Sequence, residues 1–239
     1  MKILPHMEIV DLALYFDSTL VIADVHIGYE EALNKQGVLV PRLQFEEMAK
    51  RIGSILKTLK GDPVKTIVVN GDLKYEFGTI SEQEWRNTLK FLDLLAKHCQ
   101  DIVLVKGNHD TILGLIAKKR NVRVVDYYIA GKVLVAHGDK TPNKETLKHI
   151  STIIIGHEHP AVSLKEGARV EQFKCFLKGR YKGRNLIVQP SFNTMIEGTN
   201  LLRDTILSPF LKQNLDNFEV YVVEDKVYNF GKVNGLKKS

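Results

Sequence analysis

Short apolar runs alternate with longer amphipathic stretches through the first half of the chain. Runs rich in Val and Ile occupy 19–23, 66–69 and 101–106, and such short β-branched runs are typical of buried strands. Apolar residues recur at helical spacing over 41–59. Another helix is predicted to begin at Ser81, because a Ser cap with a Glu three residues later is a capping-box signature. This order of elements predicts an α/β fold.

The second half of the chain is richer in predicted strands and poorer in predicted helices. Further strands are predicted at 13–16, 122–125, 132–136, 153–155, 171–177 and 185–188, with a final hairpin over 218–223 and 226–230. Short helices are predicted over 111–118, over 141–149 and beyond Thr199. Gly37 and Pro41 are chain breakers, so 29–41 is predicted to be a connection.

Polar residues of the kinds that bind metals follow five of the predicted strands. Side chains two residues apart in an extended segment point to the same side, so a pair spaced in this way can chelate one ion. Alone, each of these ends is a weak signal, since polar residues at a strand end more often cap the next segment. Their recurrence is the stronger evidence, and in chain order they are Asp24 and His26, Asp72, Asn108 and His109, His137, and His157 and His159.

This ordered set of motifs resembles the calcineurin-like metallophosphoesterase superfamily over about residues 13–193. Within it, the segments 22–30, 37–41 and 156–160 are similar to those of small prokaryotic PdeM-type phosphoesterases, some of which are associated with DNA repair ligases. One departure follows Asp72, where residues 73–77 lack a further polar residue that many members have.

The resemblance implies a four-layer α-β-β-α sandwich, with a β-sandwich core between helices. We expect a single domain over 1–239, with the motif core at 13–193 and a C-terminal helix and hairpin at 200–231. The alternation of strands and helices supports the first half of this architecture independently.

Two divalent metal ions are implied by the same resemblance. Asp24, His26 and His159 are predicted to hold the first ion, and Asn108, His137 and His157 the second. Asp72 is predicted to bridge them, which suits two ions ~3.5–4 Å apart. Mixed imidazole and carboxylate ligands favour transition metals over Ca, so Mn is the first choice, with Fe, Zn, Ni and Co as alternatives.

The resemblance also places His109 outside the ligand set, facing the scissile ester. There a protonated imidazole donates to the departing oxygen or stabilises the phosphoryl oxygens. Asp110 is predicted to orient His109. The alternative for His109 is a structural hydrogen-bonding residue.

Composition adds few constraints. The chain has 239 residues, 44% hydrophobic and 26% charged, and no apolar run approaches the ~18 residues of a membrane helix. Two cysteines, Cys99 and Cys175, fit a reducing compartment, so we expect a cytoplasmic protein without a membrane partner. The net charge of +6 favours anionic partners. The basic segment 178–184 is either a phosphate-backbone contact or, as the favoured alternative, an exposed hairpin tip.

These observations predict an enzyme that hydrolyses phosphate esters with metal-bound hydroxide. A phosphodiesterase acting on nucleic acid, or on a cyclic nucleotide or dinucleotide, fits the closest resemblance. A phosphomonoesterase or protein phosphatase is the first alternative, and a non-catalytic scaffold of the same fold is the second. The oligomeric state is left open, a homodimer included.

Overall fold

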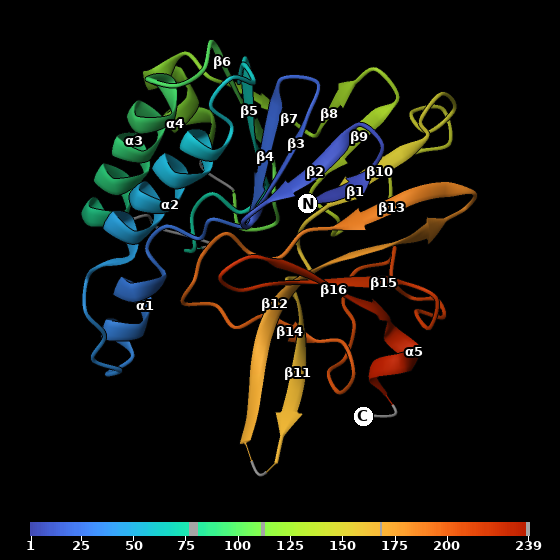
Figure 1. Cartoon of the computed structure of the whole chain (residues 1–239). Coiled ribbons are helices and arrows are strands. Elements are labelled where there is room, and N and C mark those ends of the chain that lie inside the picture. The colour runs from blue at the N-terminus through green and yellow to red at the C-terminus, as the bar shows by residue number, and fades with distance from the viewer. Residues whose placement is uncertain (77–80, 111–112, 168, 238–239) are drawn as a thin grey trace.

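A computed structural model describes residues 1–76, 81–110, 113–167 and 169–237. Two β-sheets pack face to face, and helices cover the outer face of the first sheet (Figure 1). This arrangement confirms the predicted mixed α/β class and the sandwich of two sheets. Within the described ranges, no helix is both long enough and apolar enough to cross a membrane.

The first sheet is built by the N-terminal half of the chain. Its strands, in spatial order, are β1 (Lys2–Leu4), β2 (Met7–Val10), β3 (Ala13–Phe16), β4 (Thr19–Ala23), β5 (Thr66–Asn70), β6 (Asp101–Val105) and β7 (Arg123–Val125). β1 to β4 form an antiparallel meander, and β4 to β7 run parallel. The carboxyl ends of β4, β5 and β6 therefore meet at one edge of the sheet, where open α/β sheets bind ligands.

Four helices belong to this half: α1 (Tyr29–Lys35), α2 (Gln44–Thr58), α3 (Glu82–Ala96) and α4 (Leu113–Arg120). The predicted cap of α3 is confirmed, because the Ser81 hydroxyl accepts a hydrogen bond from the Glu84 amide at 3.1 Å. The Glu84 carboxylate does not return this contact. It accepts hydrogen bonds from the Tyr75 and Glu76 amides instead, so α3 is linked to the loop after β5.

The second sheet is built by the C-terminal half. Its elements are β8 (Tyr127–Ala130), β9 (Val133–Ala136), β10 (Thr152–Ile155), β11 (Pro160–Glu166), β12 (Arg169–Tyr181), β13 (Arg184–Val188), β14 (Thr199–Asn200), β15 (Glu219–Val223), β16 (Val227–Lys232) and the short α5 (Val233–Leu236). β9, β10 and β13 run parallel in the centre, and β15 pairs with β12. The final predicted hairpin is confirmed as β15 and β16.

Alternation along the second sheet separates two hydrophobic cores. Ile154 of β10 faces the core between the sheets, whereas Ile153 and Ile155 face the outer core, as the two-residue period of a strand requires. Phe210 and Leu211 cover the outer core from the irregular segment before β15. The fourth layer therefore consists mainly of turns and α5, whereas the resemblance implied a helical layer.

Three predicted segments differ from the structure. The predicted connection over 29–41 begins with α1, and Gly37, with a φ of 86°, follows the end of that helix. The predicted helix over 141–149 is a series of turns, because the Asn143 side chain accepts from the Thr146 amide and competes with helix formation. Residues 201–218 form turns and loops where a helix was expected. Residues 111–112 of the predicted helix over 111–118 lie outside the described residues.

Candidate metal centre

Five loops leave the carboxyl ends of β4, β5, β6, β9 and β10 and meet at one point between the sheets. Two glycines make this close approach possible. A Cβ atom at Gly107 would lie 2.0 Å from the Asp72 carboxylate, and one at Gly156 would lie 2.3 Å from the Asp24 carboxylate. The structure brings together all seven predicted ligands, namely Asp24, His26, Asp72, Asn108, His137, His157 and His159.

The backbone at these residues is strained. Five of the seven have positive φ angles between 41° and 65°, and these are Asp24, His26, Asp72, His157 and His159. Residues other than glycine seldom adopt this left-handed region, and such strain clusters at functional sites, where surrounding contacts hold it in place.

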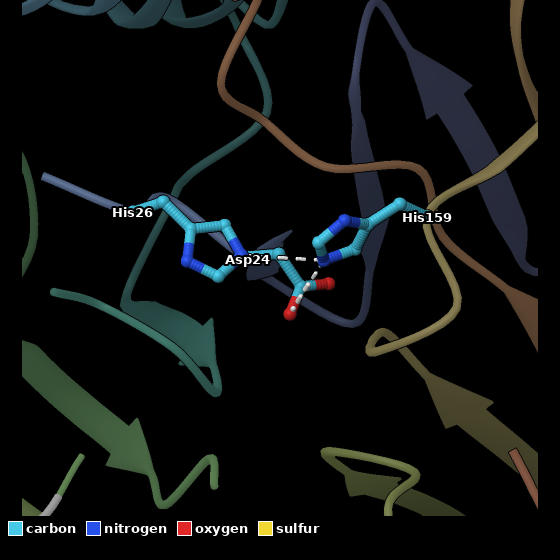
Figure 2. A group of neighbouring side chains, drawn as sticks. All are labelled: Asp24, His26 and His159. Carbon is cyan, nitrogen blue, oxygen red and sulfur yellow. Dashed lines mark hydrogen bonds and ion pairs between the residues drawn. The ribbon is translucent and has the colours of Figure 1, made fainter. Parts of the chain in front are cut away.

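The first group of donors joins the loops after β4 and β10. Nε2 of His159 lies 3.4 Å from Oδ1 of Asp24 and 3.3 Å from Nε2 of His26. Figure 2 shows the His26 and His159 side chains converging beside the Asp24 carboxylate. Ligand atoms that share an ion through bonds of about 2.0–2.2 Å lie roughly 3.0–3.5 Å apart. The spacing of this group therefore fits one transition-metal ion.

The second group surrounds Nε2 of His137. This nitrogen lies 2.9 Å from Oδ1 of Asn108, 3.1 Å from Nδ1 of His157 and 3.5 Å from Oδ2 of Asp72. The same Asp72 oxygen lies 4.0 Å from Nε2 of His26 in the first group. Asp72 thus stands between the two groups, where a carboxylate can serve both.

The electrostatics of the site favour bound cations. Burial raises the pKa of a carboxyl group, but the imidazoles of His159, His137 and His26 outweigh this effect and hold the pKa of Asp24 well below its ordinary value. Burial and the nearby charge of Asp24 raise the pKa of Asp72 to about 9. Burial also lowers the pKa of His26 and brings that of His137 to about 4. Neutral imidazoles are the form that binds metal ions.

One ligand atom is left unsatisfied by the protein itself. Among the residues that the structure describes, Oδ1 of Asp24 is buried without a hydrogen-bond partner. Buried polar atoms are normally paired, so an exception calls for an explanation such as a bound ion. The donor set and this unpaired oxygen both fit a divalent metal centre.

The sequence matches the family described as calcineurin-like phosphoesterase over residues 18–175. The chain belongs to this family. Members of the calcineurin-like phosphoesterase family typically bind divalent metals, in agreement with the donor groups of Asp24, His26, Asp72, His137 and His159. No curated protein sequence matches the chain.

Solved structures show the same fold. The nuclease MPE of Pseudomonas putida has a TM-score of 0.62 and 20% identity, covering 93% of each chain. A protein of unknown function from Aquifex aeolicus has a TM-score of 0.39 and 22% identity, over 59% of this chain and 78% of its own. YfcE, a phosphoesterase from E. coli, has a TM-score of 0.40 and 13% identity, over 90% of this chain and 97% of its own.

His109 lies beside the ligands in this calcineurin-like site. Its Nδ1 lies 2.6 Å from the Tyr75 carbonyl oxygen, and its Nε2 lies 3.9 Å from Oδ2 of Asp72. The Tyr75 carbonyl therefore holds Nδ1 protonated and leaves Nε2 toward the site. Burial lowers the pKa of His109.

The structure corrects the reason given for Asp110. Its carboxylate accepts hydrogen bonds from the Gly107 amide at 3.0 Å and from the Leu73 amide at 3.1 Å. Asp110 therefore fastens the loop after β6 to the loop after β5, and the Tyr75 carbonyl contacts the ring nitrogen that Asp110 was expected to orient. Any effect of Asp110 on His109 passes through the backbone.

Several supporting residues were missed in the sequence. Glu158, between His157 and His159, is buried, and its Oε2 accepts from the Leu207 and Ser208 amides at 3.0 and 2.8 Å. The Ser208 hydroxyl donates to the Gly138 carbonyl at 2.8 Å. This Glu158 clamp ties the loops after β9 and β10 to a distant segment.

A second support comes from the loop after β13. The Ser191 hydroxyl donates to the Asp24 carbonyl at 2.7 Å, and the Phe192 amide donates to the Ala23 carbonyl at 2.8 Å. Nζ of Lys174 donates to the carbonyls of Ser191 and Asn193 at 3.0 and 2.8 Å. The 190–193 turn was identified from sequence, but nothing in the local pattern linked it to Asp24.

Proposed function

We propose that this protein is a dinuclear metal-dependent phosphodiesterase that acts on nucleic acid or nucleotide diesters. The observation that carries the proposal is the position of the Asp72 carboxylate. Its Oδ2 lies 3.5 Å from Nε2 of His137, 4.0 Å from Nε2 of His26 and 3.9 Å from Nε2 of His109. One oxygen thus connects both donor groups with the acid–base residue.

The ligand roles follow from this geometry. Asp24, His26 and His159 would hold one ion, Asn108, His137 and His157 would hold the other, and Asp72 would bridge them. Bound Mn²⁺, with Fe, Zn, Ni and Co as alternatives, would lower the pKa of a water so that hydroxide is available near neutral pH.

His109 supplies the proton in this proposal. The Tyr75 carbonyl fixes the ring through Nδ1, so Nε2 is the atom that donates to the oxygen of the departing group. Such proton donation contributes about a hundredfold or more to a hydrolytic rate. Asp110 is proposed to support this step by holding the loop that carries His109.

Nucleic acid or nucleotides are the proposed partners. The net charge of +6 favours an anionic substrate, and the similarity to a nuclease of the same fold points the same way. The basic segment 178–184 does not support the proposal. Its turn at Lys182 and Gly183 lies at the amino end of β13, which is parallel to β10, and so at the edge opposite the metal ligands. Arg184 there donates to the Leu147 and Ile150 carbonyls.

A comparison of two synthetic esters tests the proposal. The full chain, freed of metal and reloaded with Mn²⁺, should hydrolyse bis-p-nitrophenyl phosphate with a higher kcat/KM than p-nitrophenyl phosphate. A preference for the monoester would establish a phosphomonoesterase instead. Absence of turnover with Mn, Fe, Zn, Ni and Co would establish a scaffold.

A further inference from the structure

Two tyrosines stand directly beside the candidate metal centre. Tyr29 begins α1, three residues after His26, and Tyr75 comes three residues after Asp72. Their rings meet edge to face, with centroids 4.9 Å apart. The Tyr75 ring also lies 5.8 Å from the His26 ring and 5.8 Å from the His109 ring, stacked on the latter at 29°. The pair therefore borders both an ion ligand and the proposed proton donor.

Core packing does not account for this pair. Neither Tyr29 nor Tyr75 belongs to the two hydrophobic cores formed by the described residues, whereas Tyr181 and Tyr221 do. Both side chains of the pair are half-buried. Within the described part of the chain, neither phenol hydroxyl takes part in a hydrogen bond. The pair thus leaves aromatic surface open next to the site.

From this placement we infer that Tyr29 and Tyr75 form a stacking platform for a nucleobase adjoining the scissile phosphate. The inference rests on the proposed phosphodiesterase function and specifies its substrate class. Aromatic side chains bind unpaired bases by stacking, and they do so with little sequence preference because every base has a π face. Bases inside a duplex are already stacked and paired. The substrate is therefore a single-stranded nucleic acid or a dinucleotide, without a strong base preference.

Tyr29 is the better residue for the test. The Tyr75 backbone carbonyl holds His109, so a change at Tyr75 would disturb the proton donor as well. Among the described residues, the Tyr29 side chain makes its ring contact with Tyr75 only. Tyr228 of β16 is a matched control, because it is a half-exposed tyrosine on the last strand of the second sheet.

The experiment compares two substrates that share one leaving group. Thymidine p-nitrophenyl phosphate carries a nucleoside on the other ester position, and methyl p-nitrophenyl phosphate carries a methyl group there. Wild-type protein loaded with Mn²⁺ should prefer the thymidine ester in kcat/KM. In Tyr29→Leu, the ratio of the two kcat/KM values should fall by roughly tenfold, mainly through KM for the thymidine ester. Tyr228→Leu should leave the ratio unchanged.

Two aromatic variants guard against a fold defect in Tyr29→Leu. Tyr29→Phe should keep the wild-type ratio, and Tyr29→Trp should keep or raise it, since both retain the stacking surface. A fall in the ratio in either variant comparable with that in Tyr29→Leu would overturn the inference.

The remaining outcomes separate the inference from the function on which it rests. Equal kcat/KM values of the wild-type protein for the two esters would overturn the stacking platform and leave the phosphodiesterase proposal standing. An equal loss of the ratio in Tyr228→Leu would also overturn the platform. Hydrolysis of neither ester with any of the five metals would overturn both proposals.

Discussion

Loops from the first sheet and loops from the second sheet meet at the metal centre, but they are fixed by different bonds. In the first sheet, the loops after β4 and β5 pair through their backbones, with His26 and Ile27 amides donating to the Asp72 and Leu73 carbonyls at 2.9 and 3.0 Å. In the second sheet, a backbone bond from the Gly156 amide to the His137 carbonyl is supplemented by the Glu158 side chain.

This difference has consequences for mutation. A backbone bond survives most substitutions, because every residue except proline carries the same donor and acceptor. The Glu158 clamp depends on a single side chain and on residues 207–208, which lie beyond the 18–175 family match. The first-sheet half of the site should therefore tolerate changes in its supporting side chains better than the second-sheet half.

The largest effect is expected where the two halves join, at Asp72. Asp72→Ala removes the oxygen that lies between His26 and His137, so at least one ion should be lost. Activity should fall by roughly a thousandfold, the upper end for a single electrostatic group. Elemental analysis of the purified variant checks the metal content, and Asp126→Ala, at an exposed aspartate, is the control. Retention of two ions would contradict the bridging role.

His109→Ala examines a first-sheet side chain that is fixed by a backbone carbonyl. Loss of an acid–base group should lower kcat by roughly a hundredfold, while both ions stay bound. Steady-state kinetics with metal analysis tests this, and His149→Ala, at an exposed histidine, is the control. If metal were lost instead, His109 would be a ligand.

The Glu158 clamp offers the direct test of the comparison. Glu158→Ala leaves the buried amides of Leu207 and Ser208 without their acceptor. Metal affinity should drop about 10- to 100-fold, as for other residues that support ligands, and the free energy of unfolding by about 1–3 kcal/mol. Titration calorimetry and denaturant melts measure both.

Conservative and distant variants complete this test. Glu158→Gln keeps one acceptor oxygen and should lose less affinity than Glu158→Ala. Glu145→Ala, at an exposed glutamate, should change neither quantity. Unaltered metal affinity in Glu158→Ala would show that the second-sheet half does not need the clamp.

The smallest effect concerns Lys174, which supports the turn behind Asp24. Burial, with a contribution from the Arg51 charge, lowers the pKa of Lys174 from 10.5 to about 7. Between these values the unfolded chain binds more protons than the folded chain. The free energy of unfolding should therefore rise with pH in this window, by at most about 1.4 kcal/mol per pH unit.

Removing the amine should remove this slope. Denaturant melts of wild-type protein and Lys174→Met in EDTA, at several pH values above about 7, compare the two. The wild-type protein should gain stability relative to the variant as the pH rises. Parallel dependences on pH would contradict a neutral Lys174 in the folded protein.

Local patterns in the chain were sufficient to identify the ligands. Each lies next to a short apolar run that forms a strand by itself, as at Asp24 after β4 and Asp72 after β5. The helices α2 and α3 and the final hairpin were also predictable, because hydrophobic periodicity and the Ser81 cap act within a few residues. The five motifs in order then pointed to the family.

Only the tertiary structure decided how these residues work together. The Tyr75 carbonyl at His109, the Glu158 clamp and the tyrosine pair join segments that are far apart in sequence. Such contacts depend on strand pairing across the two sheets, which aligns the carboxyl ends of β4 and β10 and leaves the basic turn at the opposite edge. Pairing between distant strands is set by the packing of the whole chain, so no local pattern of side chains contains it.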